Sequence, residues 1–426
     1  MPNKYKTLML LPIISLFLAG CTIQDLPVIG GLFGGGGKTT EPVTLVFWGL
    51  WEDSGVMNVL IQKYQEQNPN VTINYEDRSI MTTVDYKERI FTRSQQSSGI
   101  DLALVHNTWV PDLVTLLAPM PKNLMDVSQY TTSYYPVAAQ SAVFDGEIYA
   151  VPAYYDGLVL VYNKKHFKEI GQNFPPTAWE EFRRLAIELT VRGPDGELKR
   201  GGAAIGTAKN IDHSTDIVGL MMAQAGIAVP EQMDTKPAQD ALTFYTNFAK
   251  VDKVWSEAMP NATEAFTKEQ ASMIFVPTWQ ILDILKAMPN INDVGVAAVP
   301  QALIDNPVSW GSFWMYAVPS NSTNSAVAWD FINFLAQPEQ QQLYFSEASK
   351  IRAFGPPYSA VSLKDTVANP YITPVLDSAP FAKSSEIAGR AGNRRQADAL
   401  NTSIEEVLSG ASAKDALSRA KVEIEK

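Results

Sequence analysis

The chain has 426 residues, of which 46% are hydrophobic and 19% are charged, a composition typical of a folded globular protein. A single hydrophobic core rarely grows beyond roughly 250–300 residues, so this length predicts two lobes. The net charge of −11 argues against a nucleic-acid partner, because binding to phosphates requires clustered Lys and Arg.

The first residues have the pattern of a secretion signal. Lys4 and Lys6 precede an apolar run over residues 8–18, which is too short to span a bilayer, a task that needs about 20 apolar residues. The run ends in Leu18-Ala19-Gly20-Cys21, which contains the only Cys and resembles the lipobox of bacterial lipoproteins. We therefore predict a signal peptide over residues 1–20 and lipidation at Cys21; the alternative is a plain secretory signal with an unrelated Cys.

A Gly-rich tether is predicted over residues 21–40, because chains rich in Gly behave as flexible coils. Ordered structure is expected from about residue 41, starting with a buried strand over residues 43–48. Ser54 can cap a helix that ends at Asn68-Pro69, and a second strand follows over residues 71–75. This βαβ unit predicts an α/β protein with a parallel sheet and helices on its faces.

The same alternation continues to the end of the chain. A hairpin-like turn is expected over residues 144–152, and a helix is expected from about Thr177, which has capping-box spacing to Glu180. A further amphipathic helix is predicted over residues 326–335. The remaining predicted strands cover residues 101–105, 158–162, 273–276, 294–299 and 313–318.

Several segments, taken in order, resemble the bacterial extracellular solute-binding protein family 1, which includes maltose-binding protein. They are Gln67 to Val71, Asp145 to Pro152, Val161 to Lys164, Pro176 to Phe182, Ala271 to Met273 with Pro277 to Trp279, and Ala328 to Leu335 with Pro338 to Gln340. The resemblance implies a two-lobe periplasmic-binding-protein fold of type II, with the ligand in a cleft between lobes that close about a hinge. It also implies crossover segments near Pro152, Trp310 and Phe354.

The lobes that follow from these crossovers are each built from two stretches of the chain. The N-terminal lobe would contain residues 41–151 and 311–355, and the C-terminal lobe would contain residues 152–310 and 356–426. The resemblance further implies a monomer without a cofactor, held by its lipid at the extracytoplasmic face of the cell envelope. Its partners would be a small-molecule ligand, most simply a mono- or oligosaccharide, and the permease subunits of an ABC importer.

Ligands of open α/β sheets bind beyond the carboxyl ends of the strands, and this rule selects the candidate site. Six of the nine Trp lie at predicted strand ends or in loops, beside acids and amides. Sugars suit this mixture, because their C–H faces stack on aromatic rings while their hydroxyl groups bond to carboxylates and amides. The candidate ligand-binding residues are Trp48, Trp51, Glu52, Asp53, Asn107, Trp109, Tyr154, Tyr155, Asp156, Trp279, Trp310 and Phe313.

The resemblance places Trp48, Glu52 and Asp53 in the family's first binding loop, Asp156 on a sugar-binding acid and Trp279 on a stacking aromatic. Each of these residues also has a structural interpretation. Trp48 and Trp109 could belong to the core, Glu52 and Asp156 could be solvated surface acids, and Trp314, inside a predicted strand, is assigned to the core. The chain departs from the family at Ala397-Asp398-Ala399, where maltose-binding protein contributes another aromatic residue.

Other functions remain open at this point. The three His residues (His106, His166 and His213) are scattered, so no zinc or catalytic spacing is present, although Glu52-Asp53 could suggest glycoside hydrolysis. The tandem phenols Tyr154 and Tyr155 could hold Fe(III). The acid-rich loops could accept a cationic solute, an amino acid, a peptide or a polyamine, and the same fold could serve as a ligand sensor. We expect no catalytic residue and no metal site.

Overall fold

The computed structural model describes residues 41–96, 99–389 and 391–425, all within one compact unit. The predicted signal peptide, the Gly-rich tether and the lipidation site at Cys21 lie outside the described residues. Within the described ranges, no helix combines the length and the apolar character that crossing a bilayer requires.

The first sheet has five strands in the order β2-β1-β3-β13-β6. β1 (Val43–Gly49), β2 (Val71–Asp77) and β3 (Leu102–His106) run parallel, which confirms the predicted βαβ unit. β13 (Trp314–Ala317) pairs antiparallel with β3, and β6 (Val151–Pro152) pairs antiparallel with β13. The sheet is therefore mixed, because a strand from late in the chain is inserted beside the early ones.

Helices cover this sheet because their apolar faces match its buried strands. α1 (Ser54–Gln67) packs on β2 and also contacts α12 (Ser325–Ala336) and α13 (Pro338–Ser349). The Tyr64 hydroxyl donates a hydrogen bond of 2.7 Å to Asp330, which ties α1 to α12. The other helical elements of this part are α2 (Thr83–Ser94), η1 (Asn107–Trp109), α3 (Val110–Leu113), η2 (Val114–Leu116), α4 (Val127–Ser133) and α5 (Pro136–Ala142).

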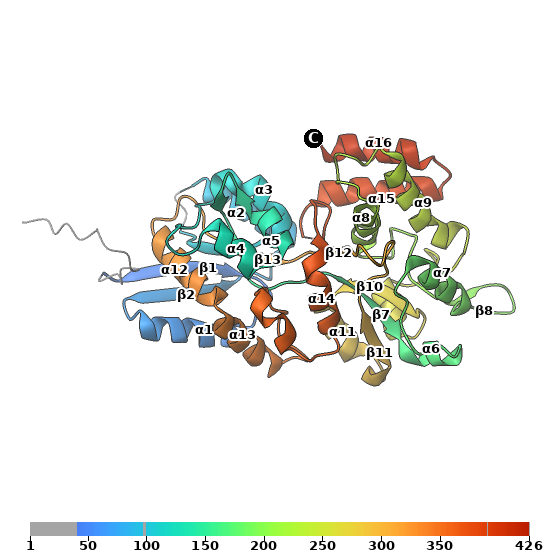
Figure 1. Ribbon diagram of the computed structural model, residues 1–426, viewed down its shortest axis with the longest axis horizontal. Coiled ribbons are helices and arrows are strands. Elements are labelled where there is room, and N and C mark those ends of the chain that lie inside the picture. Colours follow the sequence, from blue (N-terminus) through green and yellow to red (C-terminus); the bar gives the residue numbers. More distant parts are fainter. Residues whose placement is uncertain (1–40, 97–98, 390, 426) are drawn as a thin grey trace, which may run out of the picture. The chain divides into compact units, whose positions relative to one another are not determined.

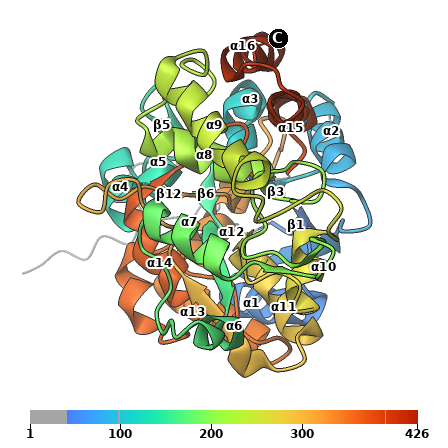
Figure 2. The same ribbon diagram turned by 90° about the vertical axis from the view of Figure 1, so that its right-hand side faces the viewer.

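The second sheet has three antiparallel strands in the order β10-β7-β11. Its central strand, β7 (Leu158–Asn163), is buried along its whole length between β10 (Met273–Pro277) and β11 (Val294–Ala297). The helices around it are α6 (Lys164–Glu169), α7 (Trp179–Glu188), α8 (Ser214–Gln224), α9 (Lys236–Lys250), α10 (Ala262–Thr267), α11 (Thr278–Ala287), α15 (Arg394–Leu408) and α16 (Ala413–Ile424). α15 and α16 lie side by side and contact α9 (Figure 1, Figure 2).

Short elements complete the chain. The two-stranded pairs are β4 (Val143–Phe144) with β5 (Glu147–Ile148), β8 (Val191–Arg192) with β9 (Leu198–Arg200), and β12 (Ser309–Trp310) with β14 (Ala382–Lys383). The remaining helical segments are η3 (Ile291–Asp293), η4 (Val361–Thr366), α14 (Thr373–Ser378) and η5 (Ala379–Phe381).

The chain passes from the first sheet to the second between β6 and β7, and it returns between β12 and β13. These passages lie where crossovers near Pro152 and Trp310 were predicted. The third passage was predicted near Phe354, but η4 still contacts α4, and Ala360 forms a bridge with Tyr134. The exact lobe boundaries therefore stay a prediction.

Two predicted helix caps are wrong. The residue that caps α1 is Asp53, not Ser54, because the Asp53 carboxylate accepts a hydrogen bond of 2.7 Å from the amide of Gly55. The helix predicted from Thr177 begins at Trp179 with Ala178 as its N-cap and no side-chain cap. Glu181, not Glu180, accepts a bond from the Thr177 amide.

The cap of α1 can be tested by substitution. Asp53→Ala should lower the free energy of unfolding by about 1 kcal/mol, because the first turn of the helix loses its acceptor. Ser54→Ala is the matched control and should change it by less than about 0.5 kcal/mol. Chemical denaturation of both variants measures the difference, and an equal loss in the two would assign the capping role to neither.

Candidate ligand-binding site

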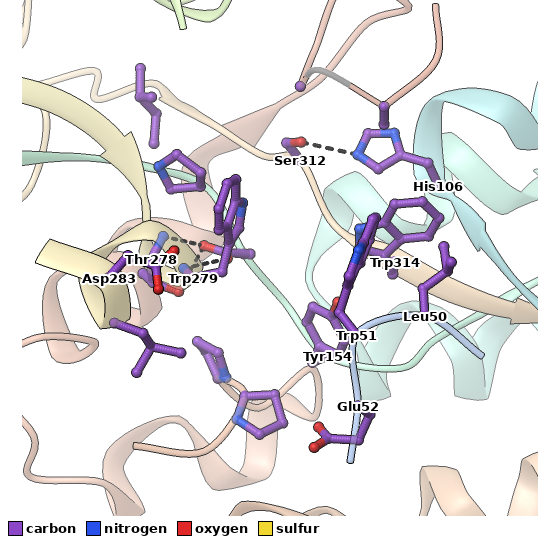
Figure 3. A pocket seen from close by; sticks show the side chains of 18 of the residues that line it. Leu50, Trp51, Glu52, His106, Tyr154, Thr278, Trp279, Asp283, Ser312 and Trp314 are labelled. Carbon is purple, nitrogen blue, oxygen red and sulfur yellow. Dashed lines mark hydrogen bonds between the residues drawn. The ribbon is translucent and has the colours of Figure 1, made fainter. Parts of the chain in front are cut away.

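A cavity of about 630 Å³ lies where strand ends and crossover segments of both sheets meet. Its wall includes Leu50 to Glu52 after β1, His106 at the end of β3, and Thr278 and Trp279 at the start of α11. Figure 3 shows Thr278 and Trp279 facing Trp51 and Trp314 across the cavity. The position agrees with the rule that ligands bind beyond the carboxyl ends of strands.

Three indoles dominate the aromatic wall. Trp279 and Trp51 are 53% and 49% exposed, which is unusual for such large apolar side chains and leaves ring surface open to the cavity. Trp314, assigned to the core from the sequence, is buried but also lines the cavity, and the Trp51 ring packs edge-on against it at 5.0 Å between centroids. Its strand hides most of the indole, but its position at the start of β13 leaves one edge at the site.

The backbone of Trp51 is in the left-handed region, with φ of 56°. This conformation is costly for a bulky residue and persists only where neighbouring contacts enforce it. The Trp51 amide donates a hydrogen bond to the Ser79 hydroxyl. The next two residues are also fixed, because Glu52 is buried and Asp53 caps α1. The loop after β1 therefore holds a strained aromatic residue at the cavity wall.

Glu52 lines the cavity, but its carboxylate is already bonded within the protein. It accepts hydrogen bonds from the Tyr344 hydroxyl at 2.6 Å, the Asp53 amide at 3.0 Å and the Arg352 guanidinium at 2.9 Å. The Arg352 pair also neutralises its charge. Neither Tyr344 nor Arg352 could be found from the sequence, because they lie about 300 positions away. Glu52 therefore anchors the loop of Trp51 to the segment after α13.

Asp156 is buried on the crossover between β6 and β7, and it acts as a remote cap for α11. Its carboxylate accepts hydrogen bonds from the Thr278 amide and hydroxyl, both at 2.9 Å, and from the Trp279 amide at 3.3 Å. The N-cap residue of α11, Pro277, supplies no side-chain cap, so Asp156 takes this role. Burial raises the pKa of Asp156 to about 6, against the opposing effect of these hydrogen bonds.

His106 and Ser312 form a polar contact at the cavity wall, with 3.0 Å between His106 Nε2 and Ser312 Oγ (Figure 3). Burial lowers the pKa of His106 to about 3, so the ring is neutral at physiological pH. Its Nδ1 lies 2.8 Å from the Thr108 hydroxyl and 3.4 Å from the Thr108 amide, so both ring nitrogens have polar partners that hold the ring in place.

A second polar group, which the sequence did not predict, is centred on Asp216. Its carboxylate accepts hydrogen bonds from the Trp310 indole at 2.8 Å and the Gly389 amide at 2.6 Å, and it contacts His213 Nδ1 at 2.9 Å. All four residues line the cavity. The one local signal was the spacing of His213 and Asp216 at the start of α8. This spacing also occurs in ordinary helices, so it does not identify a site.

Three of the twelve predicted residues serve structural roles at the cavity's margin. Trp48 is buried under the Arg78 guanidinium, 4.5 Å from the ring centroid. The Trp109 indole is buried and donates to the carbonyl of Ala391. Asp53 caps α1. None of these three side chains forms part of the cavity wall.

Three further predicted residues lie behind the wall. Asn107 is buried, accepts a bond of 3.0 Å from the Phe313 amide and donates to Ser384 at 2.9 Å. The rings of Phe313 and Tyr155 pack at 5.6 Å, and Tyr155 also packs on Tyr135. Tyr154, by contrast, lines the cavity. The two adjacent phenols therefore point to different surroundings, an arrangement that does not suit shared binding of a metal ion.

The structure thus brings together six of the predicted residues, namely Trp51, Glu52, Tyr154, Asp156, Trp279 and Trp310. Within the described ranges, no cluster of three or more His, Cys, Asp or Glu could hold a metal ion. The residues that sequence reasoning did not single out include Thr83, His213, Asp216, Tyr344 and Arg352.

The sequence and the structure are both similar to known proteins. The pattern of the family described as bacterial extracellular solute-binding protein matches residues 49–342. A "Probable ABC transporter-binding protein" of Deinococcus radiodurans is 22% identical over 273 residues, which cover 60% of this chain and 62% of that protein. The diacetylchitobiose binding protein of Streptomyces coelicolor is 27% identical over 179 residues, which cover 39% of this chain and 40% of that protein.

Solved structures show the same architecture. The cyclic alpha-maltosyl-1,6-maltose binding protein of Arthrobacter globiformis superposes with a TM-score of 0.73 at 20% identity, covering 90% of this chain and 98% of that chain. This likeness confirms the predicted two-lobe α/β fold of the periplasmic solute-binding proteins, type II.

The raised pKa of Asp156 predicts a pH-dependent stability. The folded protein keeps the proton up to about pH 6, whereas the unfolded chain loses it near pH 3.8, so the free energy of unfolding should fall as pH rises through this window. Asp156→Asn lacks this titration. The stability advantage of the native chain over the variant should therefore be about 2 kcal/mol larger at pH 4 than at pH 7. Urea denaturation at both pH values tests this, and a constant difference would contradict it.

The left-handed conformation of Trp51 predicts that a Gly variant is more stable than an Ala variant at this position, the reverse of the order in a helix. Trp51→Gly should unfold with a free energy about 1 kcal/mol higher than Trp51→Ala, because only Gly adopts this φ without steric cost. Trp279 is the matched control, since it lies in α11, where Gly is about 1 kcal/mol worse than Ala. Denaturation curves of the four variants measure these free energies. If Ala is more stable than Gly at position 51, as it should be at position 279, the backbone of Trp51 is not strained.

Proposed function

Because the chain belongs to the bacterial extracellular solute-binding proteins, within the ABC transporter family, we propose that it binds a carbohydrate in this cavity and delivers it to an importer. The observation that carries the proposal is the pair of half-exposed indoles, Trp51 and Trp279, which face each other across the cavity (Figure 3). Flat apolar rings that are kept open to solvent suit the C–H faces of a sugar.

The electrostatics of the wall favour an uncharged ligand. The three buried carboxylates of the cavity, Glu52, Asp156 and Asp216, already accept hydrogen bonds from protein donors. A cation bound directly to these oxygens would have to displace protein donors, and at Glu52 it would break the buried pair with Arg352, which is costly. A cationic solute could still bind to indole faces, but the carboxylates that suggested it in the sequence are occupied.

The relatives support a sugar as the ligand class. The names of the Arthrobacter globiformis and Streptomyces coelicolor proteins identify a cyclic maltose derivative and diacetylchitobiose as their ligands. These names describe those proteins, and their low sequence identity leaves the particular sugar of this chain undetermined by comparison. The aromatic wall is the feature of this chain itself that agrees with them.

Delivery to an importer requires the protein to close on its ligand outside the cytoplasm. We propose closure about the passages between β6 and β7 and between β12 and β13, where the chain connects the two sheets. The proposed anchor is a lipid on Cys21, supported by the apolar run and the small residues before it. The protein would then act as a monomer at the extracytoplasmic face, with permease subunits as its partners.

A substitution of Trp279 tests the carbohydrate proposal. The first step is a thermal-shift screen with mono- and oligosaccharides, amino acids, polyamines and Fe(III). A ligand at a hundred times its Kd adds about 2.7 kcal/mol to stability. For the sugar that binds, Trp279→Ala should weaken binding by more than tenfold in titration calorimetry, while the melting temperature changes by only a few degrees.

Phe174→Ala is the matched control, because Phe174 is an exposed aromatic residue outside the cavity wall. It should leave both the affinity and the melting temperature unchanged. A screen in which only cations or amino acids raise the melting temperature would refute the carbohydrate proposal.

A further inference from the structure

One face of α11 follows the cavity for two helical turns. Trp279, Leu282, Asp283 and Lys286 all line the cavity, at spacings of three, one and three residues that place them on one side of a helix. At a rise of 1.5 Å per residue, the seven steps from Trp279 to Lys286 span about 10 Å. The cavity therefore follows the helix over about this length, with the ring of Trp279 near the start of the face.

A second part of the wall lies near Glu52. The segment from Phe354 to Pro357 lines the cavity, and its carbonyl groups are held by other residues. The Pro357 carbonyl accepts a bond of 3.0 Å from the Tyr155 amide, and the Phe354 carbonyl accepts one of 3.3 Å from Arg352. Arg352 is itself paired with Glu52. The segment is thus a fixed, largely apolar surface that presents no free charge.

The two ends of the cavity differ in their access to solvent. His106, Asp216 and Trp310 are buried, with His106 in contact with Ser312 and the Trp310 indole bonded to Asp216. The side chains of Asp283 and Lys286 are 64% and 72% exposed. In Figure 3, His106 and Ser312 lie across the cavity from Asp283. One end is therefore closed by protein, and the other opens to solvent beside α11.

From this shape we infer that the cavity binds a neutral oligosaccharide of at least two units by one chain end. The terminal unit lies between Trp51 and Trp279, and the next unit passes along α11 over Asp283 and Lys286, which form an outer subsite. This inference rests on the proposed function, because it takes a carbohydrate as the ligand.

The charges at the outer subsite suit neutral hydroxyl groups. Asp283 and Lys286 lie 3.5 Å apart, so an acceptor and a donor stand side by side with no net charge. Neighbouring hydroxyls of a sugar unit can donate to the carboxylate and accept from the ammonium group. An anionic unit would be attracted by Lys286 but repelled by Asp283, which removes any preference for an acidic sugar.

The test is a calorimetric titration of the protein with three linear series of one to four units: α-1,4-glucose, β-1,4-mannose and β-1,4-N-acetylglucosamine. In the series that binds, the disaccharide should bind at least tenfold more tightly than the monosaccharide. Lys286→Ala and Asp283→Ala should each remove most of this gain while the affinity for the monosaccharide stays the same. Lys268→Ala is the control, since Lys268 is an exposed lysine paired with Glu264 outside the cavity.

The end-binding geometry is tested with the same oligosaccharide carrying a bulky fluorophore at either its reducing or its non-reducing end. One label should abolish binding and the other should be tolerated, because only one end faces the closed part of the cavity. Equal affinity for monosaccharide and disaccharide, or equal tolerance of both labels, would overturn the inference and leave the proposed function standing. Failure of every sugar to bind would instead overturn the proposed function.

Discussion

The site depends on one buried carboxylate, that of Asp156. It lies on the first crossover segment, caps α11 and so sets the position of Trp279. The same residue binds the return crossover through its backbone, because its carbonyl accepts a bond of 3.0 Å from the Ser312 amide. Movement of either crossover segment would therefore shift the start of α11, to which Asp156 is hydrogen-bonded. The acid that the sequence suggested as a ligand group therefore positions an aromatic ring of the cavity wall.

The polar and the apolar groups of the cavity wall therefore have different roles. The buried carboxylates are saturated with protein donors, while the exposed fractions of Trp51 and Trp279 are left without a protein partner across the cavity. Burying a charge is tolerable only when it is paired and hydrogen-bonded, so the acids stabilise the wall. The open indoles bear the unfavourable contact with water that a ligand can relieve. The backbone of Trp51 is also strained, so the proposed binding surface contains a second feature that lowers the stability of the folded protein.

Much of the fold could be predicted because it is recorded in local patterns. The runs of β-branched and aromatic residues predicted β1, β2, β3 and β7 to within a few residues. The βαβ unit predicted the parallel pairing of β1 and β2, but β7 pairs antiparallel with both of its neighbours. The helix caps could not be assigned in the same way. Asp53 and Ser54 are adjacent and both can cap, and the choice depends on backbone angles that composition does not reveal. The loops at the strand ends were located correctly, but half of their candidate residues turned out to face away from the cavity.

The sequence by itself determined the α/β class, the main strands with some of their helices, and the loops in which a ligand could bind, because hydrophobic periodicity and turn residues act over a few positions. Only the tertiary structure decided which side chains reach the cavity and what each of them is free to do. Glu52 meets Arg352, and Asp156 meets Thr278, across long stretches of chain, so their hydrogen bonds exist only after folding. A carboxylate can stabilise a wall or bind a ligand with the same chemistry, and its burial and its partners make the difference.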